Sequence, residues 1–231
     1  MNQQSKLIYE LKDLKKVYDN RSVLQIGRLQ FHPGTIYGLI GPVGSGKSTL
    51  LRILAGNEKQ TEGTLTYEGE EFKSGWFKKV SGNENIFLSA AELLPENKKI
   101  SQLYSDFFPK KLSNIQSKYF SKGVQKEFWD QPIKSLSPGE KAWISMILAV
   151  EGDPRVLLVD DYGALLDTAL EYEFRRRLKK MNKELGTTII LAAPTEQHIR
   201  KIAAVLVHLD NGHIAKIRPG VSKTNSKSYR K

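Results

Sequence analysis

The sequence has no cysteine, no long apolar run and fewer acids than bases. The missing cysteines exclude disulfide frameworks, thiolate zinc sites and cysteine nucleophiles. The longest uninterrupted apolar run, Ile202–Val207, has six residues, and Ile189–Ala193 has five, whereas a membrane-spanning helix needs ~20. A transmembrane helix is therefore excluded. Because Met1–Lys6 is polar, we also expect no signal peptide and a cytoplasmic location.

Net charge is the first feature of the sequence that points to binding partners. Lysine and arginine number 36 against 25 acids, a net charge of +11 in 231 residues. A surface with this charge attracts nucleotides, nucleic acid or an anionic membrane leaflet, or it serves solubility alone. The net charge does not distinguish among these four possibilities. The basic tail 221–231 is expected to be disordered. Five lysines follow one another with no acid between them: Lys110, Lys111, Lys118, Lys122 and Lys126.

The first seventy or so residues predict β-structure with one helix. Apolar alternation and turn residues indicate antiparallel strands with a turn at Asp19–Arg21. A compact apolar strand then runs into a glycine-rich loop and a helix. The expected strands are Leu7–Val17, Val23–Phe31, Thr35–Ile40 and Gly63–Phe72, the last ended by Glu68-Gly69, and the helix is Ser48–Leu54.

The rest of the chain predicts an α/β core with an insertion. About residues 86–135 carry Leu, Phe, Tyr and Lys at helical spacing, which indicates a small inserted helical subdomain. Strands and a helix then alternate, which predicts a parallel sheet covered on both faces. We expect one domain over residues 1–220. The expected elements are the strands Val156–Val159, Thr187–Ala192 and Ala204–Leu209 and the helix Thr168–Leu185.

A phosphate-loop pattern lies between the strand ending at Ile40 and the helix that follows it. Its glycines let the backbone amides face phosphates, assisted by the positive end of the helix. Lys47 would hold the β- and γ-phosphates, and Ser48 would coordinate Mg²⁺. The sequence therefore predicts a site for a nucleoside triphosphate, built from Gly41, Pro42, Val43, Gly44, Ser45, Gly46, Lys47, Ser48 and Thr49.

Two acids end a second apolar strand. Asp160 and Asp161 follow Val156–Val159, and a carboxylate at the end of such a strand reaches the magnesium site. Four apolar residues before two acids could also be a buried strand ending in a solvated turn. Beside a phosphate loop we expect Asp160 to be the metal ligand.

Leu136-Ser-Pro-Gly-Glu140 resembles the signature motif of the ATP-binding cassette (ABC) family, normally Leu-Ser-Gly-Gly-Gln. The resemblance covers nearly the whole chain. It includes Ala164–Asp167, similar to the family's dimer-interface loop, Gly152–Arg155, and Val205–Ile214 with its turn at Asp210.

The resemblance implies a site shared by two chains. In the family, ATP lies between the phosphate loop of one cassette and the signature of another, so Ser137 and Gly139 would contact the γ-phosphate held by a second cassette. Tyr18 matches the aromatic residue that stacks on adenine. The implied fold is a P-loop NTPase core with an N-terminal antiparallel β-subdomain, and the implied partners are separate transmembrane permease subunits.

Several positions depart from the family pattern. Asp161 stands where the family has the glutamate that polarises the attacking water, and it is shorter by about 1.5 Å. A displacement near 1 Å can cost ~100-fold in rate, so slow hydrolysis is expected. Pro194 stands in place of the switch histidine and has no polar side chain. His198 could replace that histidine or be a plain surface residue.

Two more departures concern magnesium and the signature. The family's glutamine after the Ile86 strand is missing, and Ala91 and Glu92 are nearest by position. In the signature, Pro138 and Glu140 replace glycine and glutamine, and the proline removes one amide donor. Together the departures predict weak catalysis by Lys47 and Asp161, and pairing with an identical or a more complete cassette.

Three functions compete at this stage. The first is the ATP-binding subunit of a transporter, peripheral on the cytoplasmic membrane face, with its lysines near anionic lipid. The stretch Asp130–Ser135 is faintly similar to polysaccharide exporters and favours export. The second is a soluble cassette acting on nucleic acid or ribosomes; such proteins usually carry two cassettes or long coiled-coil insertions, so we do not expect a nucleic-acid partner. The third, a small phosphoryl-transfer kinase, would not need the signature.

Overall fold

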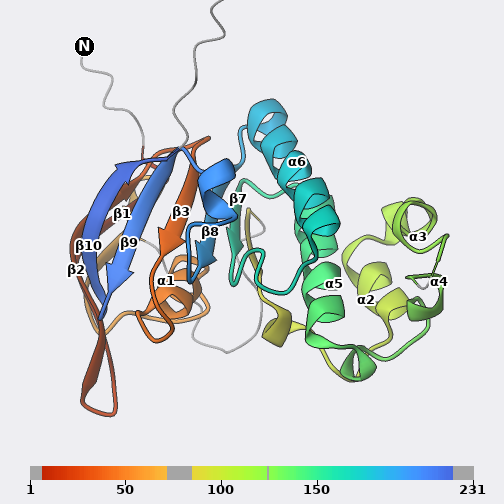
Figure 1. Ribbon diagram of the computed structural model, residues 1–231. Helices are drawn as coiled ribbons and strands as arrows, with labels where there is room; N and C mark the ends of the chain where they lie inside the picture. Colours follow the sequence, from red (N-terminus) through yellow and green to blue (C-terminus); the bar gives the residue numbers. More distant parts are fainter. Residues whose placement is uncertain (1–6, 72–84, 124, 221–231) are drawn as a thin grey trace, which may run out of the picture.

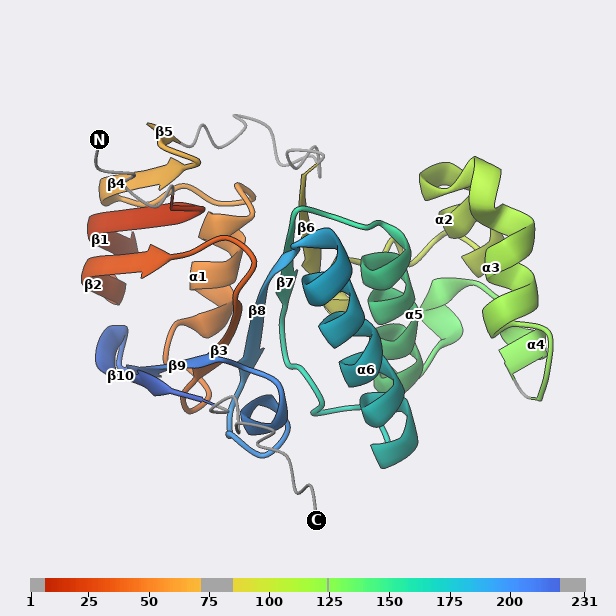
Figure 2. The same cartoon turned by 90° about the horizontal axis from the view of Figure 1, so that it is seen from above.

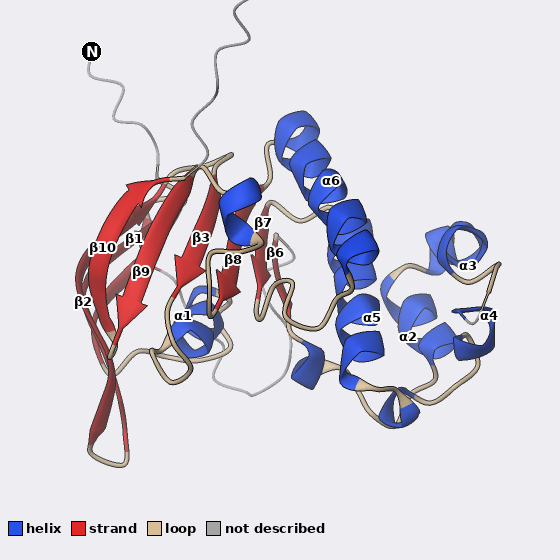
Figure 3. Ribbon diagram, viewed as in Figure 1, coloured by secondary structure: helices blue, strands red, loops and turns tan. Residues whose placement is uncertain are grey.

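The computed structural model describes residues 7–71, 85–123 and 125–220. Two sheets and a set of helices form layers, with most strands at one side and most helices at the other (Figures 1 and 3). The tail 221–231, for which disorder was expected, and Phe72, the expected end of a strand, lie outside the described residues. In the described part, no helix is long and apolar enough to span a bilayer.

The first sheet is antiparallel and has the order β2-β1-β4-β5. Its strands are β1 (Tyr9–Tyr18), β2 (Arg21–Phe31), β4 (Glu62–Tyr67) and β5 (Glu70–Glu71). The turn between β1 and β2 has positive φ at both Asp19 (44°) and Asn20 (66°), the geometry that matches the twist of a hairpin. Arg21, expected in the turn, therefore already belongs to β2.

The second sheet carries the functional residues. Its order is β10-β9-β3-β8-β7-β6, with β10 antiparallel to β9 and the other pairs parallel. The strands are β3 (Ile36–Ile40), β6 (Ile86–Ser89), β7 (Val156–Val159), β8 (Thr188–Ala193), β9 (Val205–Asp210) and β10 (His213–Pro219). This confirms the expected α/β class with its mostly parallel sheet and separate antiparallel sheet.

Alternation along β8 shows how this sheet is covered on two faces. Ile189 and Leu191 pack with the helices α5 (Pro138–Glu151) and α6 (Thr168–Leu185), whereas Ile190 and Ala192 pack with α1 (Lys47–Leu54). Apolar residues on both faces explain why the strand is an unbroken apolar run. Figure 2 shows α1 between the antiparallel sheet and the central sheet, and α5 and α6 on the opposite face.

The segment 86–135 contains the helical part, but it begins in the central sheet. Ile86–Ser89 is the strand β6, paired with β7, so the first residues assigned to the helical subdomain are not helical. The next helices in the chain are α2 (Ile100–Phe107), α3 (Leu112–Tyr119) and α4 (Gln125–Phe128). In space they lie on the side of α5 that faces away from the sheets (Figure 2). Aromatic rings join them to α5: Tyr104 stacks on Trp129, with ring centroids 6.1 Å apart, and Phe120 meets Trp143 at 5.1 Å. Short 3-10 turns lie at Ala91–Leu93, Pro109–Lys111, Ile133–Ser135 and Ile199–Lys201.

Candidate nucleotide site

The phosphate loop joins the end of β3 to the start of α1. Gly46 is the residue before the helix, and its φ of 98° is a left-handed conformation that glycine adopts without strain. A Cβ on Gly41 would lie 2.1 Å from the Leu209 carbonyl oxygen, so only glycine fits there. Close packing of Gly41 against Leu209 thus holds the base of the loop, while its tip, Pro42 to Gly44, is exposed.

Lys47 lies inside the curl of this loop. Its ammonium donates hydrogen bonds to the carbonyl oxygens of Gly41 (2.8 Å) and Pro42 (2.9 Å), and to the Ser45 hydroxyl at 3.4 Å. Burial lowers the pKa of Lys47, while the charges of Asp160 and Asp161 act to raise it. A phosphate oxygen entering the curl would therefore meet a poorly solvated cation, where a charge-assisted hydrogen bond is strong.

Asp160 meets the loop from β7. Its backbone amide donates to the Ser89 carbonyl at 2.9 Å, which places the residue at the end of two neighbouring strands. Burial raises the pKa of its carboxyl, and a hydrogen bond from Ser48 lowers it. The structure therefore brings together Ser48 and Asp160, which the sequence singled out more than a hundred positions apart.

This hydroxyl and carboxylate fit a magnesium ion that is shared with phosphates. Mg²⁺ keeps several waters and binds through one or two protein groups plus substrate phosphates, not in an all-protein cage. Consistently, the described residues contain no cluster of three or more acidic, histidine or cysteine ligands. Ser48 and Asp160 would hold the ion.

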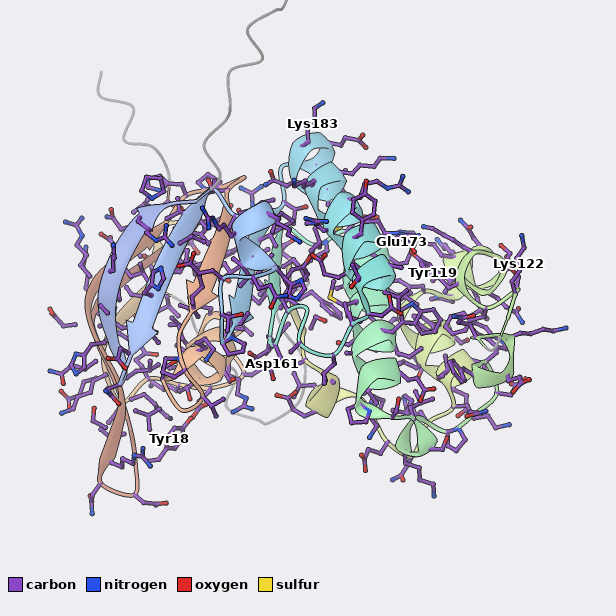
Figure 4. All side chains as sticks on the ribbon, viewed as in Figure 1. Tyr18, Tyr119, Lys122, Asp161, Glu173 and Lys183 are labelled. Atoms are coloured by element: carbon purple, nitrogen blue, oxygen red, sulfur yellow. The ribbon has the colours of Figure 1, made fainter. Side chains whose placement is uncertain are left out.

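Asp161 follows in a strained position. Its φ is 48°, outside the usual regions for a residue with a side chain, and its amide donates to its neighbour's carboxylate, Asp160 Oδ1, at 3.0 Å. Asp161 is exposed, and Figure 4 shows it near the middle of the molecule, between the strands on the left and the long helices on the right. Aspartate tolerates left-handed backbone better than most residues, so this turn suits the residue that is present.

Pro194 lies directly beside the phosphate loop. It follows the last residue of β8, Ala193, whose carbonyl accepts from the Gly41 amide at 3.4 Å. The side chain at 194 is exposed but has no polar atom.

His198 packs against Gly163, in the turn that follows Asp161. A Cβ on Gly163 would lie 2.8 Å from its Cγ, and its Nδ1 is 3.8 Å from the buried Glu171. It is only 25% exposed, so it is not a plain surface residue, and it contacts the turn after Asp161. Tyr162 donates to the same Glu171 at 3.0 Å.

Tyr18 ends β1 above the start of α1. Its hydroxyl donates to Glu58, and Lys16 lies 4.7 Å from its ring centre and 2.9 Å from the same carboxylate. Burial raises the pKa of Tyr18 to about 12, with Glu58 adding to the shift, and a hydrogen bond with Thr49 opposing it. Thr49, which the sequence placed in the site, thus links Tyr18 to the phosphate loop, whereas Lys16 and Glu58 were not named from the sequence.

Glu92 is a candidate for the place of the missing glutamine, and it lies near Ser48 and Asp160, the two residues that would hold magnesium. It forms an ion pair with Arg52 of α1 at 3.2 Å, and its charge raises the pKa of Asp160. Ala91 precedes it in the same short turn. The sequence could not reveal the Arg52 contact, because the two residues are 40 positions apart.

Ser137 and Gly139 stand apart from the phosphate loop of their own chain. They begin α5, which Figure 1 shows separated from α1 by β8 and β7. Gly139 packs against the loop 164–167, since a Cβ there would lie 3.1 Å from the Leu165 carbonyl oxygen. Leu165 itself is 48% exposed. The signature and this loop therefore form a surface that one chain leaves open.

Comparisons with known proteins agree with this geometry. A family model described as ABC transporter matches residues 24–163, a range that includes the phosphate loop, the signature and Asp160. The spermidine/putrescine import ATP-binding protein PotA of Mesoplasma florum is 31% identical over 215 residues, covering 91% of this chain and 61% of that protein. The sulfate/thiosulfate import ATP-binding protein CysA of Bacillus cereus is 27% identical over 216 residues, covering 89% and 59%. This chain thus spans about three fifths of these relatives.

Solved structures agree on the fold. The bacterial ABC transporter cassette MJ0796, solved as a dimer, superposes with a TM-score of 0.76 at 20% identity, covering 93% of this chain and 99% of that one. CbiO1 of Clostridium perfringens, part of an ABC transporter complex, gives a TM-score of 0.71 at 20% identity, covering 93% and 89%. Because the family match extends over more than half of the sequence and includes the phosphate loop, the signature and Asp160, the chain belongs to the ABC transporter family.

Proposed function

We propose that this chain is the ATP-binding subunit of a membrane transporter, at the cytoplasmic face of the membrane, working with separate transmembrane subunits and a second cassette. The observation that carries the proposal is the phosphate loop closed around Lys47, with Ser48 hydrogen-bonded to Asp160 beside it. ATP closes two cassettes on each other, hydrolysis releases them, and the motion drives the membrane subunits.

The roles in binding follow from the contacts. Lys47 exchanges its carbonyl partners for β- and γ-phosphate oxygens, and the loop amides and the α1 dipole add to the attraction. Mg²⁺, held by Ser48 and Asp160, would neutralise charge on the phosphates. Tyr18 presents its ring to the base on the face that Lys16 leaves free.

Hydrolysis is proposed to be slow. We assign the polarisation of water to Asp161, whose carboxylate is one methylene shorter than that of glutamate, and Pro194 offers no polar group beside the loop. Positioning errors near 1 Å reduce rates by ~100-fold. The site is therefore suited to binding more than to turnover.

We propose that a transmembrane subunit docks in a groove of this chain. A cavity of about 470 Å³ lies between the end of α1, β6 and α2, with Leu93, Leu94 and Phe107 among its lining residues. Phe107 is 50% exposed and Leu93 37%. Concave apolar surface of this kind is typical of partner sites.

The direction of transport is proposed from the relatives. PotA and CysA are both named as import proteins, so we favour import. The expectation of export, based on Asp130–Ser135, finds no support.

A docking variant tests the proposed function. We expect the tagged chain to be recovered from detergent-solubilised membranes of its source cells with multi-spanning proteins. Phe107→Glu should reduce this recovery at least tenfold, because burying an unpaired carboxylate is unfavourable. Tyr172→Glu, at a 60% exposed position on α6, is the matched control and should recover as much as wild type. Magnesium-nucleotide binding should be equal in all three.

Two results would count against this function. One is recovery of no membrane-spanning chain with the wild type. The other is a salt-sensitive complex with nucleic acid in its place, which would favour the soluble cassette.

Contact with anionic lipid is a further part of the proposal. Lys111 and Lys118 are paired with Asp153 and Glu151. Three exposed lysines of the helical part form no ion pair within the described residues: Lys110, Lys122 and Lys126. Figure 4 shows Lys122 at the outer edge of this part. We expect the chain to sediment with phosphatidylserine vesicles at low salt, about tenfold less after replacement of these three lysines by glutamine. Equal sedimentation of both would exclude the lysines as the contact.

A further inference from the structure

The start of α5 is closed by its own side chains. The Ser137 amide donates to Glu140 Oε2 at 2.7 Å, and the Glu140 amide donates to the Ser137 hydroxyl oxygen at 3.3 Å. Pro138 has no N–H. Among the amides from Ser137 to Glu140, Gly139 is thus the one whose hydrogen has no partner among the bonds of the described residues. This capping box uses donors that an outside anion would otherwise accept from.

Glu140 also brings a negative charge to this helix end. The positive end of a helix attracts anions, and a carboxylate there satisfies the attraction internally. No cation offsets the charge: Glu140 forms no ion pair in the described part of the chain. The adjacent Lys141 is paired with Glu96 at 2.9 Å.

We infer that Glu140 sets how tightly this chain covers the nucleotide on a facing cassette. The inference rests on the proposed function, in which the Ser137 turn meets the γ-phosphate bound by the second cassette. A γ-phosphate at this helix start would contact the free Gly139 amide and the Ser137 hydroxyl. It would also lie near the Glu140 carboxylate, which forms no ion pair in the described part of the chain. Two copies of this chain therefore close weakly on nucleotide, and the better partner is a cassette whose signature has an uncharged residue at this position.

Glu140→Gln isolates the charge. Glutamine keeps a side-chain oxygen for the Ser137 amide, so the capping box remains and only the carboxylate charge is removed. With magnesium and a non-hydrolysable ATP analogue, sedimentation velocity should show a dimer dissociation constant about tenfold lower than wild type, because the variant removes one like-charge contact near the protein surface at each of the two symmetric nucleotide sites of the dimer. The gain should shrink as salt is raised. Affinity of the monomer for the analogue should stay the same, because the phosphate loop is untouched.

Two control variants separate charge from folding. Glu127→Gln on α4 makes the same change in net charge at an exposed site away from the signature, and should dimerise like wild type. Glu140→Ala removes the cap as well, and its thermal midpoint should fall by a few degrees while that of Glu140→Gln does not.

The outcomes distinguish this inference from the proposed function. Nucleotide binding by the monomer with no gain in dimerisation for Glu140→Gln, or the same gain for Glu127→Gln, would overturn the role of Glu140 and leave the function standing. Absence of magnesium-nucleotide binding in wild type and variant alike would overturn the function itself.

Discussion

Replacing Asp161 by glutamate and Pro194 by histidine together is expected to raise the rate of ATP hydrolysis about 100-fold. The first change extends the carboxylate by one methylene toward the water. The second supplies a hydrogen-bonding ring at the end of β8, next to the phosphate loop, where Ala193 already contacts Gly41. Phosphate release at saturating magnesium ATP measures the effect.

The single variants show which residue limits the rate. Asp161→Glu alone should gain less than the pair, because position 194 beside the loop would still have no polar side chain. Glutamate also fits the positive φ at 161 less well than aspartate, which limits the gain of both variants. Asp161→Asn combined with Pro194→His should stay at or below wild type, since it removes the base. Unchanged turnover in the double variant, with ATP affinity retained, would show that these two departures do not limit catalysis.

Replacing Lys47 by alanine is expected to weaken magnesium-ATP binding by at least about 100-fold. The lysine would make two charge-assisted hydrogen bonds to phosphate, each worth ~1.5–3 kcal/mol, and Lys47 as a residue is only 6% exposed. Isothermal titration calorimetry with the non-hydrolysable analogue gives the affinity directly.

The control for Lys47 removes a lysine outside the nucleotide site. Lys179 is exposed on α6, so Lys179→Ala makes the same change of side chain and should bind nucleotide like wild type. The alanine at 47 also leaves the Gly41 and Pro42 carbonyls without their donor, so the fold of this variant is checked first by urea unfolding. A folded Lys47→Ala protein with wild-type affinity would refute the nucleotide site.

Local pattern was enough to predict the parts of the site that lie within one strand and its loop. The phosphate loop and the strand before Asp160 are short apolar runs followed by residues of special type, and both fold as expected. The positive φ values at Asp19 and Asn20 also follow from a local turn signal. These features depend on neighbours in sequence.

Other features could not be predicted because their partners are distant or their pattern is weak. Strand β10 (His213–Pro219) has mostly exposed side chains and gave no apolar alternation. The Glu58 contact to Tyr18 spans 40 positions. By pattern alone, the three apolar residues in Ile86–Ser89 fit a helix or a strand equally well; only the family resemblance indicated a strand, and the pairing with β7 is a long-range contact. The Glu140 cap was visible in principle, since serine followed three residues later by glutamate is the pattern of a capping box.

The position of α1 between the two sheets has a consequence for the affinity of the nucleotide site. Leu50, Leu51, Ile53 and Leu54 of this helix are fully buried, and close packing makes such a helix hard to displace. The start of α1 and the loop before it are therefore held in one place. An incoming triphosphate would meet amides that are already oriented, so little of its binding free energy would be lost in ordering the loop.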